Sequence, residues 1–194
     1  MRAGFIGAGK VGFTLGKYLA MHGIEISGYY SRTPASAKEA AEFTQSRYYT
    51  SIEEITKDSD TLFLTVPDGT ISEIWDDMRN LPIKNKNICH CSGSISSTVF
   101  FDAEDKGACA YSVHPLYAVS DRYHSYKKLR NAVFSVEGSE KNLDVERFLK
   151  KSSIEFTKKN QSITYIVLSI DDGAIIGGIT GNSADNKRSC HPQP

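Results

Sequence analysis

The sequence has no surplus of charge of either sign, since 23 lysines and arginines balance 23 aspartates and glutamates. Surfaces that bind nucleic acids or anionic membranes carry a clear basic excess, so neither partner is expected. No apolar run comes near the roughly 20 residues that cross a bilayer, and the opening residues do not form a signal peptide. We therefore expect a protein of the cytoplasm, with one full domain in its 194 residues.

Cysteine is also scarce. The chain has four cysteines, which favours reduced thiols over a disulfide scaffold. The tripeptide Cys89-His90-Cys91 resembles a metal site at first sight. A strand points successive side chains to opposite faces, however, so these three residues cannot assemble a tetrahedral site by themselves. We expect packed strand cysteines and no metal.

What the sequence does have is a glycine-rich stretch near its start, Gly7-Ala8-Gly9-Lys10-Val11-Gly12. It follows a short apolar strand pattern, Ala3 to Ile6, and opens a helical pattern. In such a strand, turn and helix, the first glycine permits the tight turn, the second admits a pyrophosphate to the backbone, and the third lets helix and strand approach closely. N–H groups at the helix start then bind the phosphates. The six residues are therefore predicted to bind a dinucleotide; the alternative is a plain structural turn.

The end of the second expected strand, Ile24 to Tyr30, lacks the acidic residue that holds the ribose hydroxyls in NAD-binding folds. Ser31, Arg32 and Thr33 stand there instead and offer two hydroxyls and a guanidinium. These groups are donors for the phosphate on the adenosine ribose of NADP, so NADP is the expected cofactor and NAD the less favoured one. The alternative is that Arg32 is a solvated loop arginine, while Ser31 and Thr33 serve the turn and the cap of the next helix.

Strand and helix patterns alternate over residues 1–157 without an internal repeat. This alternation predicts a doubly wound α/β domain with a mostly parallel sheet and helices on both faces. Helix starts are expected at Thr33-Pro34, at the capping-box sequence Ser51-Ile52-Glu53-Glu54, at Thr70 and at Ser139, whose helix would run to about Lys151. The later strands are expected at Asp60–Val66, Asn87–Cys91, Ala108–Val113 and Ala132–Val136, with Ile154–Phe156 closing the pattern.

Loops that leave the carboxyl ends of parallel strands form the ligand crevice of such a domain. Val66, Pro67 and Asp68 follow one of these strands and are expected to line the cofactor. The alternative is that Pro-Asp-Gly is a plain turn.

The candidate catalytic residues are His114 and Ser92, which follow two later strands at the same edge. A histidine can exchange a proton near neutral pH, as a proton donor or acceptor for a small-molecule substrate must. Ser92 is also a candidate cofactor contact, and Ser94 stands beside it. The alternative for His114 is that it only caps backbone groups.

Five stretches occur in order along the chain: Gly7-Ala8-Gly9-Lys10-Val11-Gly12, Ser31-Arg32-Thr33, Val66-Pro67-Asp68, His90-Cys91-Ser92-Gly93-Ser94 and Ser112-Val113-His114-Pro115-Leu116. Together they resemble the Rossmann-like proteins that carry a C-terminal domain of unknown function, the DUF2520 group. The wider set contains pyrroline-5-carboxylate reductases, 3-hydroxyacid dehydrogenases and prephenate dehydrogenases. The resemblance covers the chain to about Phe156. It implies a Rossmann sheet and an NADP-linked oxidoreductase that transfers hydride to or from a small organic acid, imine or ketone.

The resembled proteins continue into a helical domain that supplies dimerisation and half of the substrate pocket. Residues 158–194 are short of helix formers and lack a capped amphipathic stretch, so this domain is expected to be missing or truncated, through a truncated or shifted reading frame. The alternative is a genuine short strand at Ile163–Ile170 with a disordered end. A homodimer is expected only if a helical domain is present. Two functions stay open: an NADP-dependent oxidoreductase, or an NADP-binding module without turnover, either a sensor or an incomplete gene product.

Overall fold

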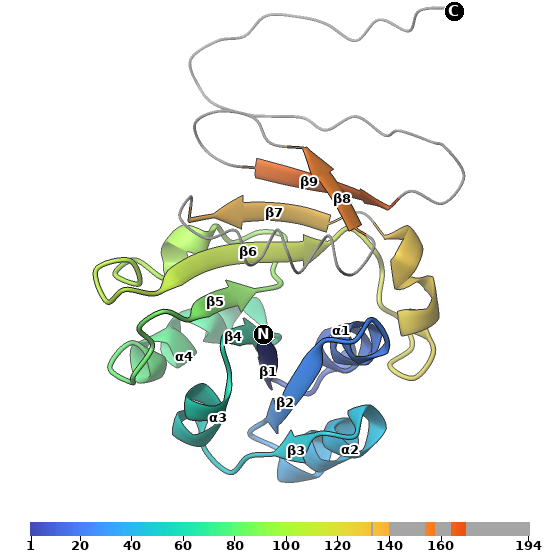
Figure 1. Cartoon of the computed structure of the whole chain (residues 1–194), viewed down its shortest axis with the longest axis horizontal. Helices are drawn as coiled ribbons and strands as arrows, with labels where there is room; N and C mark the ends of the chain where they lie inside the picture. Colours follow the sequence, from blue (N-terminus) through green and yellow to red (C-terminus); the bar gives the residue numbers. More distant parts are fainter. Residues whose placement is uncertain (133, 140–153, 158–163, 170–194) are drawn as a thin grey trace, which may run out of the picture.

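The computed structural model describes residues 1–132, 134–139, 154–157 and 164–169, shown in colour in Figure 1. The strands are β1 (Arg2–Ile6), β2 (Glu25–Tyr30), β3 (Arg47–Tyr48), β4 (Thr61–Leu64), β5 (Asn87–His90), β6 (Cys109–Pro115), β7 (Phe134–Gly138), β8 (Ile154–Thr157) and β9 (Thr164–Ser169). The helices are α1 (Lys10–Met21), α2 (Pro34–Thr44), α3 (Ile52–Asp58) and α4 (Ile71–Met78), with short 3-10 turns η1 (Asp68–Thr70), η2 (Ser97–Val99) and η3 (Ser125–Asn131).

These strands form one sheet in the order β3-β2-β1-β4-β5-β6-β7-β9-β8. From β3 to β6 each strand is parallel to its neighbour, and β7, β9 and β8 continue the sheet in antiparallel pairs. The chain leaves β1 toward β2 and β3, then returns to the other side of β1 to form β4, β5 and β6. A topological switch point therefore lies between β1 and β4, at their carboxyl ends. The expected doubly wound, mostly parallel sheet is confirmed.

Side-chain alternation along the strands divides the core into two layers, one on each face of the sheet. In β4, Phe63 joins the layer that contains residues of α1 and α2, whereas Leu62 and Leu64 join the layer with α3 and α4. All four residues of β4 are buried, as the centre of a parallel sheet requires. Phe5 of β1 stacks on Phe63 and on Tyr29 of β2, with ring centroids 5.3 and 5.1 Å apart, so the first layer is continuous across three strands.

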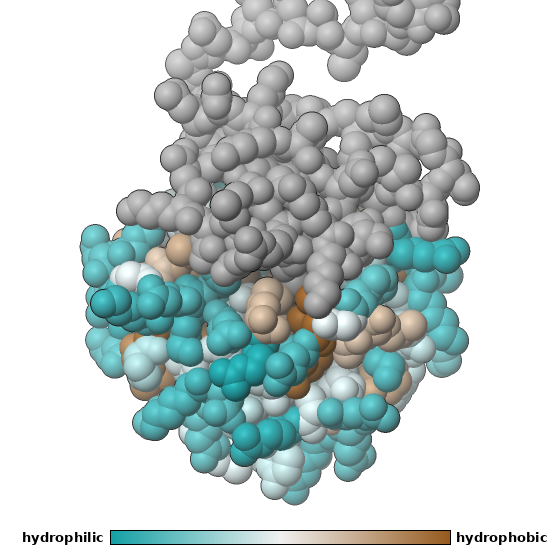
Figure 2. Space-filling model, in the orientation of Figure 1, coloured by the Kyte–Doolittle hydropathy of each residue, from teal (hydrophilic) through white to brown (hydrophobic). Residues whose placement is uncertain are grey.

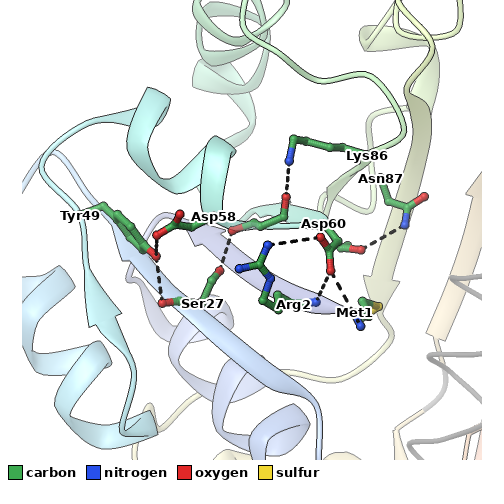
Figure 3. Close-up of polar contacts among 10 residues, drawn as sticks. Met1, Arg2, Ser27, Tyr49, Asp58, Asp60, Lys86 and Asn87 are labelled. Atoms are coloured by element: carbon green, nitrogen blue, oxygen red, sulfur yellow. Dashed lines mark hydrogen bonds and ion pairs between the residues drawn. The ribbon is translucent and has the colours of Figure 1, made fainter.

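A polar network ties together the amino ends of the strands, at the edge away from the glycine turn (Figure 3). The carboxylate of Asp60 accepts the backbone N–H of Arg2 at 2.9 Å and lies 3.7 Å from the guanidinium of Arg2. Tyr49 donates its hydroxyl to Asp58 at 2.9 Å. Burial and this carboxylate raise the pKa of Tyr49 to about 12, so the phenol stays protonated at neutral pH. The network stabilises the fold and leaves the opposite edge to the candidate site.

The coloured surface in Figure 2 is mostly hydrophilic, with an apolar area near the centre of the view and smaller ones toward its sides. Across the described residues, large exposed apolar side chains are scattered over the chain, from Met1 to Tyr123. No helix in this part of the chain combines the length and the apolar character that a membrane span requires.

Two expected helix caps lack the side-chain hydrogen bond that a cap provides. Thr33 and Thr70 occupy the N-cap positions of α2 and α4, but neither side chain bonds a free N–H of its helix. Thr70 instead donates its hydroxyl to the carbonyl of Pro67 at 2.8 Å, because the η1 turn folds that carbonyl back within reach. Ser51 caps α3 as expected, with its hydroxyl accepting the N–H of Glu54 at 3.2 Å.

The later part of the chain differs from the sequence pattern in its boundaries. β7 begins at Phe134 and ends at Gly138, two residues later than the predicted strand. β9 falls inside the stretch 163–170 and pairs with both β7 and β8, so this stretch contains a strand. Of the helix expected from Ser139 to Lys151, only Ser139 is described. The other residues of this helix and the rest of the expected tail, 158–163 and 170–194, lie outside the described residues.

Candidate functional site

The turn between β1 and α1 gives its three glycines different environments. Gly7 has φ +109°, and a Cβ there would lie 2.5 Å from the carbonyl oxygen of Thr65. At Gly12 a Cβ would lie 2.4 Å from the Thr65 hydroxyl oxygen. Gly9 is exposed, and a Cβ there would meet nothing within 4 Å. Backbone conformation and close packing therefore require Gly7 and Gly12, while Gly9 borders open space from which a ligand can reach the backbone.

The start of α1 has the properties of an anion-binding end. Gly9 is the N-cap residue and brings no side chain to the free N–H groups. The first turn contains no acidic residue, and Lys10, its first residue, is exposed. Early N–H groups of a helix have no partner within the helix, and the helix dipole adds a partial positive charge there. A phosphate would accept hydrogen bonds from these N–H groups and would be attracted by the partial positive charge.

Ser31, Arg32 and Thr33 lie beside this turn, because β2 pairs with β1 in parallel and Tyr30 stands opposite Ile6. The Thr33 N–H donates to the Ser31 hydroxyl at 3.3 Å, which shapes the loop. Arg32 is exposed and makes no hydrogen bond or ion pair with any described residue. Its guanidinium is available to a ligand.

On the other side of the switch point, hydrogen bonds join Asp68, Ser92 and Ser94. The Ser94 hydroxyl donates to Asp68 Oδ2 at 2.6 Å, and the Ser94 N–H donates to Ser92 Oγ at 3.1 Å. A carboxylate only accepts, so the Ser94 hydroxyl hydrogen points to Asp68, and the Ser92 hydroxyl, 3.2 Å away, is left to donate to Ser94. The serine hydroxyls, Ser94 first, hold the pKa of Asp68 below its usual value. Asp68 is therefore an ordered, ionised carboxylate at neutral pH.

His114 lies at the end of β6 with its ring against the same loop. Its Nδ1 is 3.0 Å from the carbonyl oxygen of Cys91. A carbonyl only accepts, so Nδ1 carries a proton, and Nε2 is the nitrogen left to exchange a proton with a ligand. A Cβ at Gly93 would lie 2.6 Å from Nε2, so the loop needs glycine there to seat the ring. The contact to Cys91 is the backbone cap considered as the alternative for His114, and it leaves Nε2 free for a second role.

The structure thus brings the predicted residues to one edge of the sheet, in two groups. The glycine turn and Ser31–Thr33 form the first group, around the ends of β1 and β2. Asp68, Ser92 and His114 form the second, around the ends of β4, β5 and β6. Val66 lies between the two groups, since its Cγ1 is 3.0 Å from the position of a Cβ at Gly7. Pro67 is exposed beside it.

The tripeptide Cys89-His90-Cys91 alternates as expected. Both cysteines pack in the layer of α1 and α2, whereas the ring of His90 meets Phe100 in the other layer, with centroids 5.5 Å apart. Burial raises the pKa of the Cys89 thiol and raises that of Cys91 to about 12, so both stay protonated. No group of three histidine, cysteine or acidic side chains among the described residues is placed to hold a metal ion.

Sequence reasoning missed Arg122, which reaches the glycine turn from the loop after β6. Its guanidinium donates to the carbonyl of Ala8 at 3.4 Å, pairs with Glu39 of α2 at 3.1 Å and stacks 4.2 Å from the ring centroid of Phe13. Ala8 and Arg122 are 114 positions apart, and no local pattern links them. Gly93, whose role depends on a neighbouring histidine, was missed for the same reason.

A hollow of about 540 Å³ lies elsewhere, beside η2 and the end of β7. Phe100, Phe101, Glu104 and Glu137 are among its lining residues, and no predicted site residue is. Glu137 already accepts the N–H and the hydroxyl of Ser97 at 2.9 and 2.7 Å. The ligand crevice expected from the topology is therefore at a different place from the hollow.

A parallel sheet whose first strand leads through a glycine turn into a helix, with a switch point beside it, defines the dinucleotide-binding class of α/β domains. Residues 1–115 match the sequence profile of the Rossmann-like domain family. The chain belongs to this family. Comparison of the sequence with curated proteins finds no match.

Several solved structures share the fold. They include a protein of Bacteroides fragilis assigned as an NADP oxidoreductase, the 3-hydroxyisobutyrate dehydrogenase of Mycobacterium tuberculosis, and a reductive aminase from Aspergillus terreus in complex with NADPH. Their TM-scores are 0.65, 0.62 and 0.61, at 23%, 19% and 16% sequence identity. The matches cover 78%, 78% and 77% of this chain and 56%, 51% and 52% of those chains. The chain thus spans about half the length of these structures, and the likeness is one of fold.

Proposed function

We propose that this chain is the cofactor-binding domain of an NADP-linked oxidoreductase that transfers hydride to or from a small organic acid, imine or ketone. The observation that carries the proposal is the glycine turn beside an unpaired arginine. Gly9 leaves open space over the start of α1, and Arg32 next to it has a free guanidinium. A dinucleotide with an extra phosphate on its adenosine ribose matches both features.

Each part of NADP has residues suited to it. Gly7, Ala8, Gly9, Lys10, Val11 and Gly12 would hold the pyrophosphate, and Ser31, Arg32 and Thr33 the phosphate on the ribose. Val66, Pro67, Asp68 and Ser92 would line the cofactor further along the edge. The fit rests on the open backbone at Gly9 and on the absence of acid from the first turn of α1.

NADP supplies the hydride chemistry when bound. The protein's own groups would orient the cofactor and the substrate, exclude water and move a proton. His114 is suited to the proton, because its Nδ1–H is held by the Cys91 carbonyl and its Nε2 is free. Ser92 would help to position the loop that contains Ser94, since its hydroxyl hydrogen is directed to Ser94. The similar structures support NADP as the cofactor, because they include a reductive aminase with NADPH and a protein assigned as an NADP oxidoreductase.

The alternative, an NADP-binding module without turnover, makes a different prediction for the same preparation. The candidate catalytic groups, His114 and Ser92, come from one side of the crevice, and the chain spans about half the length of the structures it matches. Productive geometry requires a substrate held against the cofactor from both sides. Steady NADPH oxidation with a small carbonyl or imine, abolished by His114→Ala, would favour the enzyme; binding without turnover would favour the module.

Calorimetric titration with NADP and NAD tests the cofactor assignment. Charge-assisted hydrogen bonds from Arg32 should make NADP bind at least roughly tenfold more tightly than NAD. Arg32→Ala should weaken NADP and leave NAD nearly unchanged. Arg130→Ala is the matched control, since Arg130 is also exposed but lies on η3. Equal or tighter binding of NAD to the unmodified chain would contradict the assignment.

A further inference from the structure

We propose that Asp68 discriminates between the two oxidation states of the bound cofactor: its carboxylate, held by Ser94, favours the cationic ring of NADP⁺ over the neutral ring of NADPH. This inference rests on the proposed function and deepens it. It gives the negative charge of Asp68 a part in cofactor selection, where this residue is otherwise only expected to line the cofactor.

The topology places the nicotinamide half of NADP on the side of Asp68. A dinucleotide lies across the switch point with its pyrophosphate over the glycine turn. Its adenosine half extends toward Arg32, at the end of β2. The other half must then extend across the ends of β4, β5 and β6, because these strands lie on the opposite side of β1. Asp68 follows β4 and contacts Ser94, which follows β5.

Hydrogen bonds fix the carboxylate and keep it charged. Ser94 donates to Oδ2 at 2.6 Å, and the Ser92 hydroxyl also acts on this carboxylate. Asp68 is exposed at the crevice, so a ligand can approach it. The serine hydroxyls lower its pKa, which keeps the negative charge present at neutral pH.

The groups with the largest effect on the charge of Asp68 include no lysine or arginine. The nearby ionisable side chains are His90 and His114. His90 is buried and its pKa is lowered by burial, so it is neutral at pH 7. Asp68 is therefore a negative charge at this end of the crevice that His90 does not neutralise.

The two forms of the cofactor differ in a way that this charge can detect. Loss of a hydride, two electrons and one proton together, turns the neutral ring of NADPH into a cation. All phosphates are shared by both forms, so their contacts with Arg32 and the glycine turn cancel in a ratio of affinities. One charge pair about 4 Å apart in a water-like surrounding changes an affinity about fivefold. Tighter binding of the oxidised form would favour reduction of the substrate by the bound cofactor.

The experiment measures dissociation constants of NADP⁺ and NADPH for the 194-residue chain and for three variants. In Asp68→Asn the preference for NADP⁺ over NADPH should fall by about fivefold. The isosteric amide can still accept the Ser94 hydroxyl, so the loop geometry is kept. Asp77→Asn, an exposed acid on α4, is the matched charge control and should leave the ratio unchanged. Arg32→Gln should weaken both forms by similar factors.

An unchanged ratio in Asp68→Asn, with both forms still bound, would overturn the inference and leave the proposed function standing. Failure of the unmodified chain to bind either form would overturn both. A second measurement needs no variant. The preference of the unmodified chain for NADP⁺ should shrink as salt is raised from about 0.05 to 1 M, because salt screens an exposed charge. A preference independent of salt would also count against a role for the Asp68 charge.

Discussion

His90 is fully buried within the strand that precedes the Ser92 loop. Its Nδ1 accepts the N–H of Ser92 at 3.2 Å, which requires a neutral ring with the proton on Nε2. Burial lowers the pKa of this histidine. The folded protein therefore resists protonation at a pH where the unfolded chain, with a histidine pKa near 6.5, takes up a proton. The histidine thus links the order of the candidate site to pH.

We expect the free energy of unfolding to fall as pH decreases from about 7 to 5.5. In this window the unfolded state binds more protons at His90 than the folded state does, so stability rises with pH by up to about 1.4 kcal/mol per unit. Urea unfolding at several pH values measures the slope. His90→Gln should reduce it. An equal slope in the His90→Gln chain would show that this histidine titrates alike in both states.

At the scale of an element, different glycines of the turn between β1 and α1 are required for cofactor binding and for stability. A Cβ at Gly9 would meet only open space, and its φ of −79° suits any residue. A Cβ at Gly12 would collide with the Thr65 hydroxyl and with the Gly7 carbonyl, at 2.4 and 2.6 Å. The first position is therefore free on the protein side, and the second fixes the distance between α1 and the loop after β4.

Gly9→Ala should abolish tight binding of both NADP and NAD while costing under about 1 kcal/mol of stability, the scale of a poorer N-cap. Gly12→Ala should instead destabilise the fold by about 1–3 kcal/mol through overpacking. Thermal melts and cofactor titrations on both variants check the pair. Normal cofactor binding by the Gly9→Ala chain would mean that the opening stretch is a structural turn only.

The elements that could be predicted from sequence are those with a strong local signal. The buried run around β4 and the cap of α3 by Ser51 depend on neighbours in sequence, and both were predicted. The helix start at Thr70 was predicted, but its hydroxyl donates to the carbonyl of Pro67 and does not accept a helix N–H, because this carbonyl lies within its reach. The shift of β7 reflects its pairing with β6, where Val136 stands opposite Val113; sequence pattern alone does not fix such a register.

The sequence predicts which candidate site residues follow the ends of neighbouring strands, but it does not predict the contacts among them. Parallel strands end at one edge, so Asp68, Ser92 and His114 were expected to lie near one another. The direction of the hydrogen bonds among Asp68, Ser92 and Ser94 depends on side-chain orientation, which the sequence does not contain. The contact of Arg122 with Ala8 depends on how a distant loop folds over α1.

At the scale of the whole molecule, two regions compete as the place where a ligand binds. One is the crevice edge with Gly9 and Arg32, which the topology and the glycine geometry favour. The other is the hollow beside η2, lined by Phe101 and Gly138 among others. Because these regions involve different backbone amides, a single titration can distinguish them.

The most direct test of the account is an amide NMR titration of the ¹⁵N-labelled 194-residue chain with NADP. We predict that the resonances of Gly9, Lys10 and Arg32 shift or broaden as NADP is added, while those of Phe101 and Gly138 stay in place. The same titration with NAD should perturb Arg32 less. Changes confined to Phe101 and Gly138, with the glycine turn unaffected, would contradict the assignment of the crevice as the cofactor site.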